Sequence, residues 1–128
     1  MPADIVSIVR RCFEAYVAND RAAIEALIAE QFSFSSPLDN AIDRQTYFAV
    51  CWPNSQMIAN FEFVHLAAAD DQVFATYVGT ASDGRRFRNT EVHTVRDGKI
   101  AIVEVYFGWS LPHEAPQGEH IDPPAKAG

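Results

Sequence analysis

The chain has 128 residues, a net charge of −7 and a pI near 4.9, which fit one acidic globular domain. Its hydrophobic content of 48% and charged content of 21% are ordinary for a folded soluble protein. The negative charge would repel a phosphate backbone, and no basic run longer than Arg85-Arg86 offsets it, which excludes nucleic acid as a partner. No apolar run approaches membrane-spanning length, and Asp4 precedes the first apolar residues, the wrong order for a signal peptide. We therefore expect a cytoplasmic protein with no membrane partner.

The first third of the chain shows helical periodicity. Apolar residues recur every three or four positions over residues 5–17, which predicts an amphipathic helix, and Asp20 caps a second helix that reaches residue 28. Residues 32–35 alternate and predict a short strand. Asp43 is the expected N-cap of a third helix, which ends at Pro53-Asn54. Cys12 and Cys51 fall in these helical patterns, so we expect two reduced thiols.

The next part of the chain predicts four strands. Asp-Gly pairs between alternating runs favour tight hairpins, because both positions of a type I′ turn need a positive φ. The sequence thus predicts an α+β domain over residues 1–110, with N-terminal helices packed on an antiparallel meander, followed by a proline-rich tail over residues 111–128. The expected turns are Asp70-Asp71, Asp83-Gly84 and Asp97-Gly98.

If each turn is a two-residue loop, the strand pairing follows by counting. Thr90 then lies between Tyr77 and Val105 on one face, and Glu91 lies opposite Glu104 on the other. The first face collects Val64, Tyr77, Arg88, Thr90, Val92, Val103, Val105, Phe107 and Trp109, and the second includes His65, Phe74, Glu91, His93 and Glu104. Both faces are largely apolar, so we expect helices on one and a second copy of the chain on the other.

The second face carries the sharper chemistry. Glu91 and Glu104 would lie ~5 Å apart at Cβ, with His93 and His65 nearby. If buried, such a group holds a shifted proton and can perform general acid–base catalysis. The alternative is that this group lies at a solvent-exposed edge or in a dimer contact, where each glutamate pairs with histidine or arginine.

The order of elements, with a Ser-Pro exit from the short strand and the run RDGKIAIVEVYF from Arg96 to Phe107, resembles the NTF2-like superfamily. Within it the chain is most similar to the SnoaL-like and ketosteroid-isomerase-like branch, over about residues 5–110. The resemblance implies a curved sheet whose concave side, closed by helices, forms one deep pocket. Members of the superfamily include isomerases, polyketide cyclases, dehydratases, epoxide hydrolases and non-catalytic proteins, and many are homodimers. A shared fold does not transfer a function.

The catalytic groups known in that superfamily do not carry over. Ketosteroid isomerase needs an oxyanion-hole tyrosine, a base aspartate and a protonated aspartate. The tyrosine position falls near Cys12 and the base position at Ser36. The third position falls at Val92, or at His93 if a bulge is present, and that one-residue difference swaps faces. The aspartate of limonene-type epoxide hydrolases falls at Val105.

By resemblance, the face with Val103, Val105 and Phe107 lines the pocket. Tyr77 and Thr90 are then the expected catalytic groups, with Asp39, just after the Ser-Pro exit, as a possible base. The expected lining comprises Tyr16, Tyr47, Trp52, Val64, Arg88, Val92, Val103, Val105, Phe107 and Trp109. Residue chemistry favours the Glu91 and His93 face instead, so both sets remain candidates.

Two functions stay open at this stage. The first is a small-molecule-binding domain, which could act as a cofactor-independent isomerase, cyclase or dehydratase on an apolar ring substrate. The second is a non-catalytic dimeric module that binds a ligand or a protein. We expect no cofactor and no metal, because no phosphate loop, nucleophile elbow or compact ligand spacing occurs in the sequence.

Overall fold

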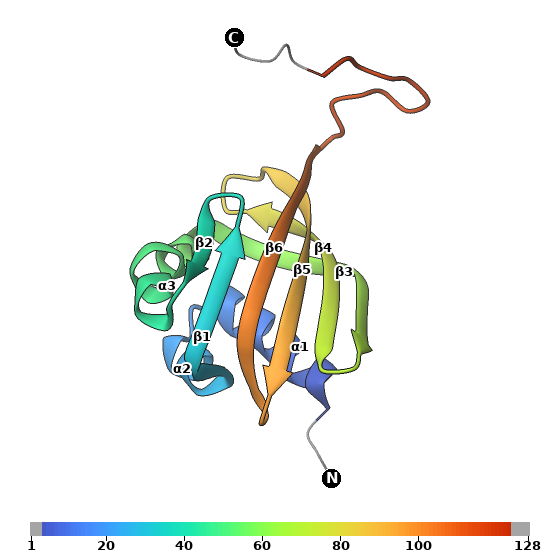
Figure 1. Ribbon diagram of the computed structural model, residues 1–128. Helices are drawn as coiled ribbons and strands as arrows, with labels where there is room; N and C mark the ends of the chain where they lie inside the picture. Colours follow the sequence, from blue (N-terminus) through green and yellow to red (C-terminus); the bar gives the residue numbers. More distant parts are fainter. Residues whose placement is uncertain (1–3, 124–128) are drawn as a thin grey trace.

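The structure is a computed structural model, and it describes residues 4–123. Three helices lie on one face of a six-stranded sheet with the order β2-β1-β6-β5-β4-β3 (Figure 1). The elements are α1 (Ile5–Val17), α2 (Arg21–Leu27), β1 (Ile28–Ser36), β2 (Asp39–Ile42), α3 (Arg44–Val50), the 3-10 helix η1 (Trp52–Met57), β3 (Ile58–Ala69), β4 (Gln72–Ala81), β5 (Arg86–Arg96) and β6 (Lys99–Leu111). The predicted α+β class is confirmed. Residues 1–3 of the predicted domain and 124–128 of the predicted tail lie outside the described residues.

The sheet is mixed rather than a pure meander. β3 to β6 pair antiparallel in chain order, as predicted, whereas β1 lies beside β6 and runs parallel to it. β2 pairs antiparallel with β1 at the edge of the sheet. The chain between β1 and β6, which includes α3 and strands β3 to β5, gives the long connection that a parallel pair needs.

Each helix begins at an aspartate whose side chain accepts a backbone N–H. Asp4 accepts from Val6 at 3.1 Å, and Asp20 accepts from Ala23 at 3.1 Å. Asp43 accepts the N–H of Thr46 at 2.8 Å. The predicted caps at Asp20 and Asp43 are therefore confirmed, and each satisfies a donor that the helix itself leaves free.

The core lies between α1 and the sheet. Ile8, Val9 and Phe13 of α1 are buried, as are Val73 on β4 and Ile100 on β6. The period of the helix presents these three α1 residues on one side, so a single stripe covers the sheet. This packing fixes which face of the sheet is interior.

A bulge on β6 changes the register that the sequence suggested. Asp97 and Gly98 have φ values of 52° and 76°, and Arg96 pairs with Lys99, so the two-residue turn is confirmed. Val95 then pairs with Ile100 but Thr94 pairs with Ile102, which leaves Ala101 as the extra residue. From there Glu91 lies opposite Val105, and Glu104 lies opposite Val92. The predicted pairs of Glu91 with Glu104 and of Thr90 with Val105 are wrong for this reason.

Two smaller irregularities adjust the other hairpins. Ala81 donates to the carbonyl of Arg85 at 2.7 Å, which makes the turn at Asp83-Gly84 a three-residue loop. Tyr77 consequently pairs with Asn89 rather than with Thr90. On β3, Val64 is bulged out between the pair of Phe63 with Tyr77 and the pair of His65 with Thr76.

These shifts define two faces. The inner face, under the helices, carries Ala75, Tyr77, Asn89, Glu91, His93, Val103 and Val105. The outer face carries His65, Phe74, Thr76, Arg88, Thr90, Val92, Glu104 and Tyr106. Because side chains alternate, a shift of one residue moved Glu91 and His93 inward and Thr90 outward.

Within residues 4–123, no helix combines the length and the apolar character that a bilayer crossing requires.

Candidate active site

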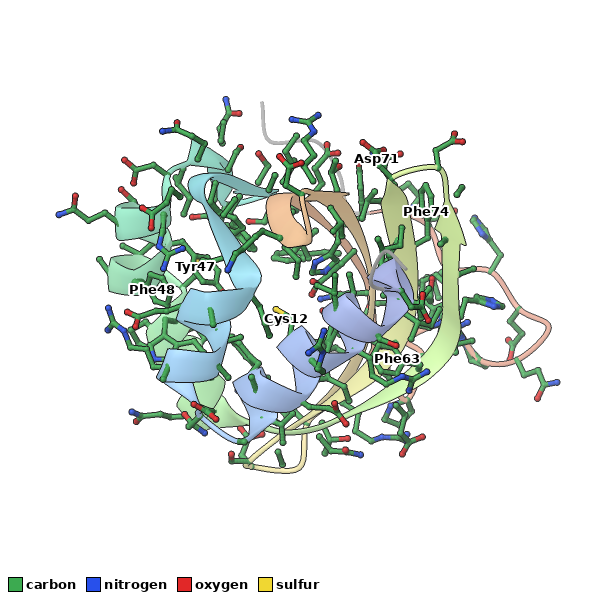
Figure 2. All side chains as sticks on the ribbon, turned by 90° about the horizontal axis from the view of Figure 1, so that it is seen from below. Cys12, Tyr47, Phe48, Phe63, Asp71 and Phe74 are labelled. Carbon is green, nitrogen blue, oxygen red and sulfur yellow. The ribbon has the colours of Figure 1, made fainter. Side chains whose placement is uncertain are left out.

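The inner face and the helices enclose a cavity of about 840 Å³, a size typical of small-molecule sites. Figure 2 shows Cys12 of α1 directed into the interior, with Tyr47 and Phe48 of α3 to one side. Most of the wall is apolar and aromatic. It includes Phe13, Phe32, Phe34, Phe61, Phe87, Ile28, Val103 and Val105.

Four polar side chains form a connected group on this wall, which we call the Glu91 cluster: Tyr77, Asn89, Glu91 and His93. The Tyr77 hydroxyl donates to Glu91 Oε2 at 2.7 Å, and His93 Nε2 lies 2.9 Å from Glu91 Oε1. Asn89 Nδ2 donates to the Tyr77 hydroxyl at 3.5 Å. β5 supplies three members at alternate positions, and β4 supplies Tyr77 from the neighbouring strand.

The Glu91 cluster is shielded from water. The side chain of His93 is 3% exposed and that of Glu91 is 14% exposed, and both line the cavity. The Phe13 ring lies 5.3 Å from the Tyr77 ring and 5.6 Å from the His93 ring. In such surroundings a hydrogen bond to a carboxylate is stronger than at the surface. The site therefore holds a positioned carboxylate in an apolar wall.

Protonation within the cluster follows from its geometry. Burial, with the nearby charge of Glu91 as the second cause, raises the pKa of Tyr77 well above its ordinary value, so Tyr77 stays a neutral donor. His93 Nδ1 is buried and has no hydrogen-bond partner among the described residues. A proton on Nε2 can be donated to the Glu91 carboxylate, which satisfies that ring nitrogen.

Asp39 is a second carboxylate in the cavity wall. It begins β2, and its Oδ2 accepts the Ser36 hydroxyl at 2.7 Å. The Ser36 oxygen in turn accepts the backbone N–H of Leu38 at 3.0 Å, which fixes the turn between β1 and β2. Asp39 thus lines the cavity, and its hydrogen-bond partner is Ser36 rather than a member of the Glu91 cluster.

Two thiols also line the cavity. Burial raises the pKa of Cys12 to about 12 and that of Cys51 to about 11, so both are neutral at pH 7. A neutral thiol is a poor nucleophile. Burial likewise raises the pKa of Tyr16 and Tyr47 above the ordinary value, so the four groups contribute shape and hydrogen bonds rather than charge.

The mouth of the cavity has an apolar rim. Leu38 is 82% exposed, Met57 56%, Phe107 53% and Trp109 49%, and all four also line the cavity. Arg85 at the same end is paired with Asp83 at 2.7 Å. An apolar ligand would meet matching surface before it enters.

The structure brings together most of the predicted lining but not all of it. Tyr16, Tyr47, Tyr77, Asp39, Val103, Val105, Phe107 and Trp109 line the cavity. Thr90, Val64, Arg88 and Val92 were placed on the pocket face, which is wrong. Thr90 instead lies on the outer face, where its hydroxyl contacts that of Thr76 at 2.8 Å. Arg88 lies over the Trp109 ring at 5.7 Å, and Trp52 packs at 5.7 Å against Tyr16 instead of lining the cavity.

The four candidates that residue chemistry suggested also lie on two different faces of the sheet. Glu91 and His93 were assigned to the face away from Tyr77, which is wrong, because the three-residue loop at Asp83-Gly84 puts them on the face of Tyr77. The bulge at Ala101 then places Val103 and Val105 of β6 on that same face. Glu104 and His65 stay on the outer face, and Glu104 accepts from the Tyr106 hydroxyl at 3.4 Å.

Asn89 was not identified from the sequence. The feature of the sequence that could have pointed to Asn89 is Gly108 on the partner strand, because glycine inside a strand often marks a bulge.

In the described part of the chain, no group of three or more His, Cys, Asp or Glu side chains could hold a metal ion.

A family model described as the SnoaL-like domain matches residues 9–103. The chain belongs to the SnoaL-like family. This SnoaL-like protein also matches 156 chains among solved structures, and the similar structures include several named NTF2-like proteins, so the chain has the NTF2-like fold. No curated protein sequence matches it.

Three of the similar solved structures show how far the likeness extends along each chain. A protein from Kribbella flavida has a TM-score of 0.73 at 14% identity, covering 80% of this chain and 85% of its own. An LEH-like epoxide hydrolase from M. tuberculosis has a TM-score of 0.69 at 16% identity, covering 80% and 81%. IdmH from Streptomyces antibioticus, a proposed polyketide cyclase, has a TM-score of 0.64 at 19% identity, covering 77% and 88%. At these identities the likeness shows the fold alone.

Proposed function

We propose that this SnoaL-like protein binds a small, mainly apolar ring molecule in its cavity and that Glu91 moves a proton on that molecule without a cofactor. The observation that supports this is the placement of one carboxylate, held by Tyr77 at 2.7 Å and His93 at 2.9 Å, in the wall of an apolar cavity. General acid–base chemistry needs a positioned group of this kind within reach of the substrate.

The proposed step begins with an ionised Glu91 and a substrate carbon next to a carbonyl. The C–H bond breaks, its proton forms an O–H bond on Glu91, and the electron pair moves to the carbonyl oxygen. If Glu91 returns the proton to a different carbon, the result is an isomerisation. If instead the electron pair returns from the oxygen to form a carbon–carbon double bond, the bond from the β-carbon to its hydroxyl breaks, the hydroxyl takes the proton from Glu91 and leaves as water, and the result is a dehydration. Tyr77 and His93 keep their protons and hold the carboxylate in place.

The test uses 2-tetralone, an apolar ring ketone with exchangeable protons at C1. Wild-type protein in deuterated buffer should speed deuterium incorporation at C1 above the buffer rate, followed by proton NMR. Glu91→Gln keeps the shape of the side chain but cannot take a proton, so the rate should fall by about 10² to 10⁴ or to the buffer level.

Glu104→Gln is the matched control, because Glu104 lies on the outer face of the same strand pair. It should exchange protons as fast as wild type. A Glu91→Gln variant at the wild-type rate would contradict the proposal. A wild-type protein that binds 2-tetralone but leaves exchange at the buffer rate would favour the non-catalytic binding module instead.

We also propose that the outer face pairs with a second copy of the chain. Val64 is 41% exposed, Phe74 39% and Tyr106 54%, and they lie on one side of the sheet. Exposed apolar side chains on one face of a sheet are costly to leave in water, and a symmetric dimer covers them with one contact.

A further inference from the structure

The side-chain amide of Asn89 is fixed in one orientation by two different neighbours. Its Oδ1 accepts the backbone N–H of Gly108 at 3.2 Å, and its Nδ2 donates to the Tyr77 hydroxyl at 3.5 Å. Flipping the amide would turn the NH₂ group toward another N–H donor, which is unfavourable. The donor end of Asn89 therefore faces Tyr77 and the cavity.

Gly108 makes this arrangement possible. It is the bulged residue of β6, between the pairs of Asn89 with Phe107 and of Arg88 with Trp109. A Cβ atom at this position would collide with the backbone carbonyl oxygen of Arg88. Only glycine lets β6 approach closely enough to present its N–H to Asn89.

One hydrogen of the Asn89 amide is left for a ligand. The amide nitrogen carries two hydrogens, and the bond to Tyr77 uses one of them. Asn89 lines the cavity one alternate position along β5 from Glu91. Its Nδ2 and Glu91 Oε2 both lie within hydrogen-bond distance of the same Tyr77 oxygen, so the two groups act on one small volume.

We propose that Asn89 is the specificity-determining donor of this cavity and that its free N–H binds the carbonyl or hydroxyl oxygen of a neutral ring molecule. The inference rests on the proposed function in one respect: the bound oxygen places the adjacent carbon beside Glu91. Negative charge that develops on that oxygen during proton removal is then met by a fixed donor. A carboxylate ligand fits poorly, because Glu91 and Asp39 already line the cavity.

The substrate class is thus a ring ketone or ring alcohol rather than a plain hydrocarbon. The probes are 2-tetralone and tetralin, which share the same ring system and differ by the oxygen. Each displaces the neutral fluorophore 1-aminoanthracene, and the loss of fluorescence gives its affinity. Wild type should bind 2-tetralone more tightly than tetralin.

Asn89→Ala removes the donor, and the affinity for 2-tetralone should fall about threefold to tenfold while the affinity for tetralin stays unchanged. Asn89→Asp, which keeps an oxygen for Gly108 but lacks the N–H, should lose the same preference and serves if the alanine variant does not fold. Thr90→Val, on the outer face of the same strand, should behave as wild type.

Equal losses for both probes in the Asn89 variants would mean that Asn89 only supports the cavity, and would overturn the proposal. A wild type without preference for the ketone, whether both probes bind equally or neither binds, would also overturn it. The proposed function fails separately. If the preference depends on Asn89 but proton exchange does not depend on Glu91, then the donor role stands and the catalytic role falls. If proton exchange depends on Glu91 but the preference for the ketone does not depend on Asn89, then the catalytic role stands and the donor role falls.

Discussion

The hydrogen bond from Tyr77 to Glu91 gives the sharpest stability prediction. Tyr77→Phe removes the hydroxyl and keeps the ring, whose contacts with Phe13 at 5.3 Å and Phe61 at 4.9 Å remain. The loss is therefore mainly that of the short buried bond to the Glu91 carboxylate, together with the longer bond from Asn89 at 3.5 Å, with little change in packing. Bonds to charged groups contribute about 1.5–3 kcal/mol, so the free energy of unfolding should fall by that amount.

Urea unfolding at pH 7, followed by circular dichroism, measures this change. For a domain of this size the same loss should lower the melting temperature by about 5–10 °C. Tyr106→Phe is the control, because Tyr106 is 54% exposed on the outer face and its hydroxyl lies 3.4 Å from Glu104. That variant should stay within about 0.5 kcal/mol of wild type. Equal effects of the two variants would refute the buried bond between Tyr77 and Glu91.

Three further predictions address other parts of the structure. Gly108→Ala should lower the free energy of unfolding by about 1–3 kcal/mol in urea titrations, because its Cβ meets the Arg88 carbonyl; an unchanged midpoint would contradict the bulge. Burial raises the pKa of Cys12 from 9.0 to about 12, so the folded state keeps a proton that the unfolded chain releases. Stability should therefore fall as the pH rises from 9 toward 12, and Cys12→Ala should flatten that slope in urea titrations at successive pH values; an equal slope would refute the assignment. Phe74→Lys on the outer face should shift a dimer toward monomer in sedimentation velocity, and an unaltered dimer would exclude this face as the contact.

The helices and the turn at Asp97-Gly98 could be predicted because their signals are local. Asp20 and Asp43 cap helices through bonds to residues three positions later, and those spacings are visible in the sequence. The parallel contact of β1 with β6 could not be predicted, because it joins segments far apart in the chain. Strand pairing of that kind depends on how the helices pack between them.

The site was harder to predict, because it depends on two single-residue shifts, a third residue in the loop at Asp83-Gly84 and the bulge at Ala101. Ala101 lies in an unbroken apolar run from Ile100 to Val103, where nothing marks a bulge. Without that bulge, counting places Glu91 opposite Glu104 rather than Val105. With a two-residue loop at Asp83-Gly84, counting also places Thr90 rather than Asn89 opposite Tyr77, which moves Glu91 to the other face. Residue chemistry and family resemblance therefore favoured opposite faces, although the structure places Tyr77, Glu91 and His93 in one cavity.

The most direct measurement is a crystal structure of the protein with 2-tetralone. We expect the ring inside the cavity against Val103, with the Glu91 carboxylate and the Asn89 amide turned toward it and Glu104 on the opposite side of the sheet. A ligand bound on the outer face, or a Glu91 side chain that points away from Tyr77, would contradict this account.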